Sequence, residues 1–175
     1  MCIRDSCEID LHGVHFTERV RLWGITCRWL NASGAHFHNY LDLGMSTFTE
    51  SASFYGAVFS GDAQFSRARF RAFANFNMAT FRGCANFSKA FFQGDTRFRD
   101  IKYEECGCGD FGGARFNVAY WHTDPPIFRV ESPGKFISEL PCGAVWADFS
   151  GESALEVDEP EVWCRENRSR DKLWC

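Results

Sequence analysis

Phenylalanine recurs along the middle of this chain at alternating intervals of six and five residues. Ten phenylalanines follow this rhythm without a break: Phe48, Phe54, Phe59, Phe65, Phe70, Phe76, Phe81, Phe87, Phe92 and Phe98. An alanine stands two positions before each phenylalanine from the second to the ninth, at Ala52, Ala57, Ala63, Ala68, Ala74, Ala79, Ala85 and Ala90. The repeated unit is Ala-x-Phe, and such a repeat constrains the fold more strongly than any other feature of the sequence.

This spacing is a poor fit to an amphipathic helix and to a flat strand. In an α-helix, steps of five and six residues turn successive phenylalanines by about 140° and 240°, so no single apolar stripe forms. A flat strand needs alternation at every second residue. A chain that turns a corner after each unit satisfies the pattern, because alanine and phenylalanine then share one parity and both point inward. Four sides make a coil of about 22 residues, and stacked coils pair as strands about 4.8 Å apart.

Glycine in the longer spacers supports these corners. Three of the six-residue spacers contain Gly61, Gly83 and Gly94, each at the same distance after a phenylalanine. Glycine tolerates a positive φ, and the aspartates next to two of these glycines suit tight turns. The spacers between repeats are therefore predicted to form the corners of the coil.

The Ala-x-Phe unit, with a small residue two positions before a large apolar one, resembles the pentapeptide-repeat family. More narrowly, it is similar to the phenylalanine-centred variant with alternating five- and six-residue spacing. The resemblance is clear over about Ala35–Tyr103. It implies an all-β fold, a right-handed quadrilateral parallel β-helix, and it implies little about biochemical function.

Weaker repeats extend the predicted solenoid in both directions. Leu11, Phe16, Leu22 and Cys27 continue the rhythm, and a one-residue slip near 32–34 is expected to form a small bulge or a deformed corner. We expect a β-solenoid over residues 7–121 and an irregular capping region with an acidic tail over residues 122–175. Residues 1–6 back-translate to a transposase adapter of sequencing libraries, so we interpret them as a sequencing artefact and expect the chain to be a fragment.

Basic residues outnumber acidic residues by three between Phe37 and Tyr103. Six of the basic residues form a candidate interaction surface: Arg67, Arg69, Arg71, Lys89, Arg97 and Arg99. With the coil length predicted above, Arg67 and Lys89 would lie on one face in successive coils. An anionic partner is one interpretation, and a solvated face spread over several sides is the alternative that the pattern favours. Nucleic acid is not expected as a partner, because no exposed ladder of aromatic residues accompanies the charges.

Cysteine and histidine provide the candidate metal ligands. The chain has nine cysteines, which we expect to be reduced in a cytoplasmic protein. Cys106 and Cys108 are the weak candidates for a zinc site with Cys142 or Cys164, although zinc sites usually have two C-x2-C pairs and a glycine-rich loop is favoured. Four histidines, His12, His15, His36 and His38, fall at outward or corner positions, and we expect them to face solvent without binding a metal.

The sequence favours a non-enzymatic structural scaffold or protein-interaction module with no cofactor. The repeated residues all serve packing, and the sequence contains no Gly-x-Ser-x-Gly, phosphate-binding loop or HExxH motif. Two alternatives follow from the resemblance: a repeat domain of a larger membrane or signalling protein, and, less favoured, a DNA mimic that protects a topoisomerase. The positive charge of the repeats argues against mimicry. No run of apolar residues is long enough for a membrane span, so none is predicted. The sequence identifies neither the protein partner nor the oligomeric state.

Overall fold

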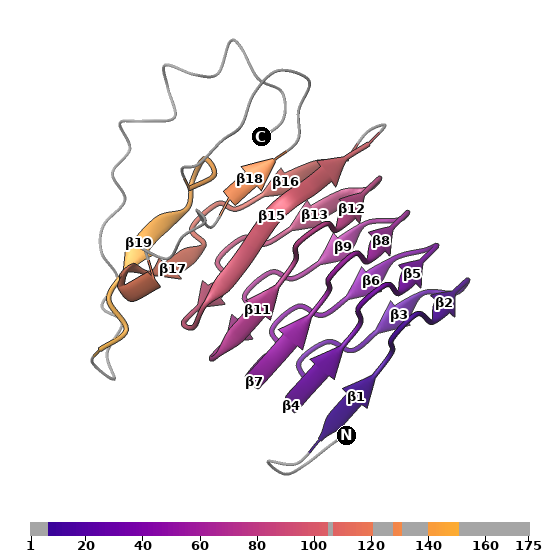
Figure 1. The fold of residues 1–175 in the computed structure, drawn as a ribbon, viewed down its shortest axis with the longest axis horizontal. Helices are drawn as coiled ribbons and strands as arrows, with labels where there is room; N and C mark the ends of the chain where they lie inside the picture. Colours follow the sequence, from indigo (N-terminus) through magenta and orange to yellow (C-terminus); the bar gives the residue numbers. More distant parts are fainter. Residues whose placement is uncertain (1–6, 105–106, 121–127, 131–139, 151–175) are drawn as a thin grey trace.

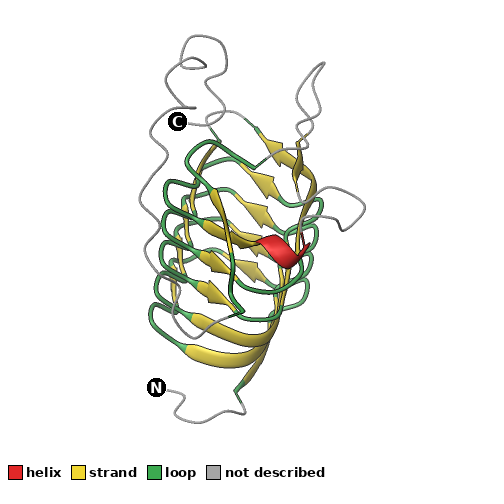
Figure 2. Ribbon diagram, turned by 90° about the vertical axis from the view of Figure 1, so that its left-hand side faces the viewer, coloured by secondary structure: helices red, strands yellow, loops and turns green. Residues whose placement is uncertain are grey.

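The computed structural model describes residues 7–104, 107–120, 128–130 and 140–150. In these residues the chain winds as a parallel β-solenoid with four sides, which we call A to D in chain order (Figure 1). Successive coils lie one above another, and the corners of each coil lie over those of the next (Figure 2). The four-sided parallel β-helix predicted from the spacing is confirmed.

Sides A and B follow each other along every coil. Side A contains β1 (Glu8–Asp10), the second halves of β4 (Thr26–Asn31) and β7 (Thr47–Ser53), β11 (Phe73–Asn75) and the first half of β15 (Thr96–Tyr103). Side B contains β2 (His15–Phe16), β5 (His36–Phe37), β8 (Val58–Phe59), β12 (Thr80–Phe81) and the end of β15. The strand β18 (Phe128–Val130) also pairs with β15.

Sides C and D complete the coil. Side C is a separate sheet of β3 (Val20–Arg21), β6 (Leu41–Asp42), β9 (Ala63–Gln64), β13 (Cys84–Asn86) and β16 (Cys108–Asp110). Side D contains the first halves of β4 and β7, then β10 (Arg69–Phe70), β14 (Phe91–Phe92), β17 (Arg115–Asn117) and β19 (Val145–Ala147). A single 3-10 turn, η1 (Val118–Tyr120), follows β17 in the described part of the chain. Among these residues, no helix has the length and apolar character needed to cross a bilayer.

The coil length changes along the solenoid. His15 pairs with His36, whereas Val58 pairs with Thr80, so the coil that begins at His15 is shorter by a single residue. The shortening lies at Arg28, because the register between β4 and β7 shifts between Cys27 and Trp29. Arg28 is the single residue between these two, whereas two residues separate their partners Phe48 and Ser51 on β7. The slip therefore lies in the preceding spacer and not at 32–34, where the sequence predicted it. Further on, additional residues before β16 lengthen the coil, so that Cys84 pairs with Cys108.

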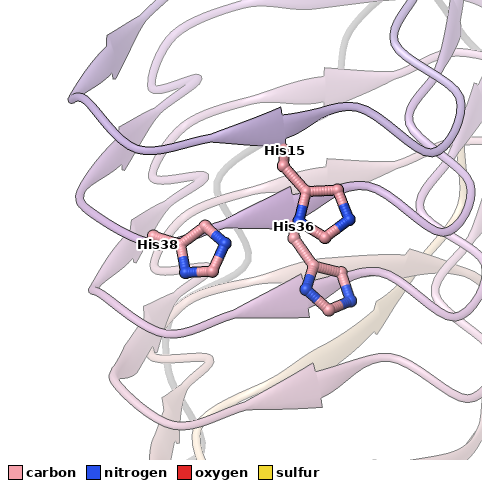
Figure 3. A group of neighbouring side chains, drawn as sticks. All are labelled: His15, His36 and His38. Atoms are coloured by element: carbon pink, nitrogen blue, oxygen red, sulfur yellow. The ribbon is translucent and has the colours of Figure 1, made fainter.

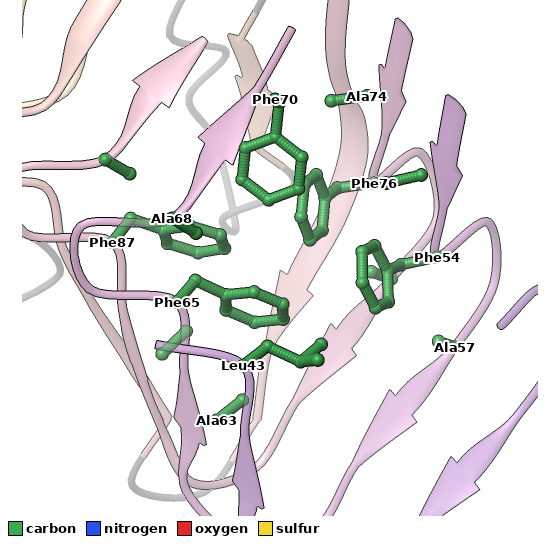
Figure 4. Close-up of a cluster of buried hydrophobic side chains, with 14 of the residues drawn as sticks. Leu43, Phe54, Ala57, Ala63, Phe65, Ala68, Phe70, Ala74, Phe76 and Phe87 are labelled. Carbon is green, nitrogen blue, oxygen red and sulfur yellow. The ribbon is translucent and has the colours of Figure 1, made fainter. Parts of the chain in front are cut away.

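The interior is filled by the repeat residues. All ten phenylalanines from Phe48 to Phe98, and the eight alanines that precede them, are buried. Phenylalanines of successive coils stack in parallel, and rings from adjacent sides meet edge to face. Phe76, for example, stacks on Phe54 with 4.8 Å between ring centroids and meets Phe65 at 90° (Figure 4). Aromatic pairs in these two geometries contribute about 0.5–1.5 kcal/mol beyond their buried area.

Two kinds of corner alternate around the coil. Each five-residue spacer is a tight turn in which the phenylalanine carbonyl accepts a hydrogen bond from the alanine N–H three residues later, as from Ala57 to Phe54 at 3.0 Å. The second residue after the phenylalanine has a positive φ, whether it is Gly56 (61°) or Met45 in the equivalent turn after Leu43 (56°). The six-residue corners are different, because Gly61, Gly83 and Gly94 are not among the residues with positive φ. A Cβ on Gly83 would lie 2.5 Å from the backbone of Gly61 in the coil below, so close stacking, and not a positive φ, requires glycine there.

Two substitutions in the tight turns are expected to change the free energy of unfolding in opposite directions. Gly56→Ala is expected to lower the free energy of unfolding by about 1–2 kcal/mol, because a residue with a Cβ is strained at positive φ. No atom lies within 4 Å of the new Cβ, so steric overlap adds nothing. Met45→Gly, at an exposed position with the same backbone conformation, is expected to raise stability by up to about 1 kcal/mol. Urea unfolding of both variants checks this, and a loss of stability in Met45→Gly would contradict it.

Candidate functional site

Four of the six predicted basic residues lie on side D or at its two corners. Arg67 and Lys89 occupy the same corner between sides C and D in successive coils, and both are exposed with positive φ. Arg69 is exposed on β10, and Arg71 follows it at the next corner. Side D and its corners therefore present a group of cations on neighbouring coils.

An outward aromatic ring lies at the centre of this basic side. Arg69, Phe91 and Arg115 are partners in register on β10, β14 and β17. The Arg69 guanidinium lies 4.9 Å from the centroid of the Phe91 ring, and that of Arg115 lies 5.6 Å from it. Such cation–π contacts are worth about 0.5–1 kcal/mol at exposed sites and favour guanidinium orientations over the ring. Phe91 and Arg115 were not among the residues predicted from the sequence, because they become recognisable only when outward positions are aligned by the coil length.

Arg97 and Arg99 lie elsewhere. Arg97 on side A lies 5.1 Å from the Phe73 ring centroid, and it also forms an ion pair with Asp95 at 2.9 Å. Arg99 is half-buried at the next corner, where its backbone N–H donates to the Asn77 Oδ1 atom at 2.7 Å. The six predicted residues are thus spread over two sides and three corners, and only the part on side D forms a continuous basic surface.

Three histidines meet on the outer surface of side B (Figure 3). His15 on β2 and His36 on β5 are partners in register, and their rings stack with centroids 4.4 Å apart. His38 points outward from the same side, 5.7 Å from the ring of His15 and 5.9 Å from that of His36. One ring nitrogen from each histidine lies within 4.8 Å of the other two. Their sequence positions predicted that these histidines point outward but did not predict that they converge.

The environment of His36 favours the neutral imidazole. Burial lowers the pKa of His36 from its usual value, and the neighbouring His15, His38 and Arg82 lower it further. A neutral ring keeps a nitrogen lone pair that can bind a metal ion. Imidazole nitrogens are ligands that Zn²⁺, Ni²⁺ and Cu²⁺ accept readily, so this cluster is a donor set of recognisable chemistry.

The cysteines differ from their predicted roles. Cys84 on β13 and Cys108 on β16 are joined by a disulfide bond across neighbouring coils. The expectation of reduced thiols is therefore wrong for this pair, and Cys108 has no thiolate to offer a zinc ion. Cys142 is also disulfide-bonded. Cys106 and Cys164, the other candidates for that zinc site, lie outside the described residues. Cys27, which continues the rhythm of the repeat, is buried.

Comparison with protein families agrees with the geometry. A family model described as pentapeptide repeats (9 copies) matches residues 32–72 and 54–102. Searches of curated proteins and of solved structures found no match. The matched segments cover the coils in which the alternation of alanine and phenylalanine is most regular. Residues 32–102 of this chain are accordingly pentapeptide repeats, and the family resemblance seen in the sequence is confirmed.

Proposed function

We propose that this chain is a non-enzymatic scaffold that binds a protein partner through the basic surface of side D. The observation that carries the proposal is the register of Arg69, Phe91 and Arg115, which presents two cations around one aromatic ring on a regular surface. Arginine and aromatic residues are enriched where proteins recognise one another.

The solenoid supplies the rigidity that such a surface needs. Phe70, Phe92 and Phe116 are buried directly behind side D and stack on one another, with centroids 5.0 and 4.4 Å apart. The backbone at the surface is thereby held, so a partner would order few additional groups on binding. A pre-organised surface loses less conformational entropy in a complex than a mobile one.

The charge on side D indicates the chemistry of the partner. Arg67, Lys89 and Arg71 surround the Arg69–Phe91–Arg115 group, and in the described structure no ion pair joins an acidic residue to any of the five cations. An extended acidic segment with apolar side chains would complement both the cations and the ring. We therefore expect the partner to offer a peptide segment rich in Asp and Glu.

Selection from a random peptide library tests this proposal. Immobilised protein is expected to enrich acidic peptides, and Arg69→Glu/Arg115→Glu is expected to lose them. Arg19→Glu/Arg21→Glu is the matched control, because it reverses two arginine charges near side C and should retain binding. No enrichment, or equal binding by both double variants, would contradict the proposal. Binding of duplex DNA in preference to the selected peptides would also contradict it.

A further inference from the structure

We propose that His15, His36 and His38 form a binding site for a divalent transition-metal ion of the Zn²⁺, Ni²⁺ or Cu²⁺ class. The three side chains come from β2, from β5 and from the residue that follows β5, and all three lie on the outer surface of side B. The three histidines belong neither to the buried core of the solenoid nor to the basic surface of side D. The site is therefore a separate feature of this chain.

The backbone holds the three ligand positions firmly. The His36 N–H donates to the Val14 carbonyl at 2.9 Å, and the His38 N–H donates to the Phe16 carbonyl at 2.9 Å. Behind the site, Phe16 and Phe37 stack with centroids 5.1 Å apart. Two strands with a fixed register therefore hold the Cα atoms of the three histidines, and only side-chain rotation is needed to bring the nitrogens together.

The nitrogen positions are close to those of a metal site. Zinc binds imidazole at about 2.0–2.1 Å, so two ligand nitrogens in a tetrahedral site lie about 3.4 Å apart. The three nitrogens here already lie within 4.8 Å of one another. His15 and His38 are exposed, and rotamers of exposed side chains interconvert rapidly, so the remaining displacement of about 1.4 Å is accessible by side-chain rotation.

The chemistry of the ligands selects the class of ion. Three imidazoles without a carboxylate disfavour Ca²⁺ and Mg²⁺, which prefer oxygen ligands. Three protein nitrogens leave at least one coordination position, which water would fill at this exposed face. In the described structure, none of the three rings shares a hydrogen bond with another residue, so no proton donor competes for their lone pairs.

Calorimetric titration with NiCl₂ and ZnCl₂ tests the site. The protein is purified without a polyhistidine tag, and its free thiols are alkylated with iodoacetamide beforehand, so that cysteine cannot contribute ligands. We expect saturable binding of one ion per chain and no binding of CaCl₂. Loss of a residue that only orients a metal ligand lowers metal affinity by about 10–100-fold. His36→Gln and His38→Gln each remove a ligand itself, so each is expected to weaken metal binding by at least about tenfold.

His12→Gln is the matched control, because His12 is exposed one corner away from the cluster and should leave binding unchanged. Imidazole ¹⁵N resonances provide a second measurement, and Zn²⁺ is expected to shift those of His15, His36 and His38 together. Thermal unfolding without metal establishes that each variant is folded. Absence of saturable binding, or equal affinity in wild type, His36→Gln and His38→Gln, would overturn the proposal.

Discussion

Phe76→Ala is expected to lower the free energy of unfolding by about 3–5 kcal/mol, which is the cost of deleting a large buried aromatic ring. Phe76 is fully buried, and its ring stacks between Phe54 and Phe98 at 4.8 Å from each centroid. It also meets Phe65 and Phe87 edge to face, at 5.4 and 5.2 Å. These rings cannot collapse into the void, because hydrogen bonds to the coils above and below fix the backbones that carry them.

Phe91→Ala is the matched control for Phe76→Ala. It deletes the same ring at an outward, half-buried position where the ring contacts two guanidinium groups. Partial burial and the cation–π contacts together predict a loss below about 2 kcal/mol. Urea unfolding followed by circular dichroism measures both variants. Equal losses would mean that the inward and outward positions have been assigned wrongly.

Gly94→Ala is expected to cost about 3 kcal/mol, the upper end of the usual range for overpacking. Gly94 is buried at the corner between sides D and A, directly over Ala72 of the coil below. A Cβ on Gly94 would overlap the carbonyl oxygen of Ala72. The obstructing atoms belong to the backbone, so no side-chain rotation can relieve the overlap, and the two coils would have to separate locally.

The control for Gly94→Ala is Gly112→Ala. The nearest atom to a Cβ on Gly112 is the Asp110 Oδ1 atom at 3.2 Å, which belongs to an exposed side chain that can move. The expected loss is below about 1 kcal/mol. Thermal unfolding of the two variants compares them directly. If Gly94→Ala were as stable as Gly112→Ala, the close stacking of coils at this corner would be wrong.

The inward half of the repeat was predictable because its chemistry repeats. Ala-x-Phe recurs at positions of one parity, and this is sufficient to predict four sides, parallel pairing and the identity of the buried rings. The corners were harder, since the pattern does not reveal backbone dihedral angles. In the tight turns, positive φ occurs at Gly56 and also at Arg67, Met78 and Lys89, so the residue type alone does not predict it. Glycine also recurs at the six-residue corners, where two backbones approach each other closely and φ is not positive.

The outward features were missed because they depend on the exact length of each coil. His15 and His36 meet only because their coil is one residue shorter than the regular repeat. The shortening lies at Arg28, between Cys27 and Trp29. Arg115 meets Phe91 because a later coil is longer than the regular repeat. A search for metal ligands at short local spacing cannot find such pairs. Aligning the polar residues by coil would have brought the histidines together, once the position of the slip was known.

Residues one coil apart are neighbours on the outer surface, and both the basic surface and the histidine cluster depend on this register. Engineered cysteines at Val58 and Thr80, which are partners in register on side B, test this claim. After mild oxidation, peptide mapping of Val58→Cys/Thr80→Cys is expected to find the two new cysteines linked, as Cys84 and Cys108 are on side C. In Val58→Cys/Arg82→Cys the second cysteine lies two residues beyond the partner of Val58, so little disulfide between the two new cysteines is expected. Equal linkage in the two proteins, or linkage only in the displaced pair, would contradict the register, and with it the basic surface and the histidine cluster.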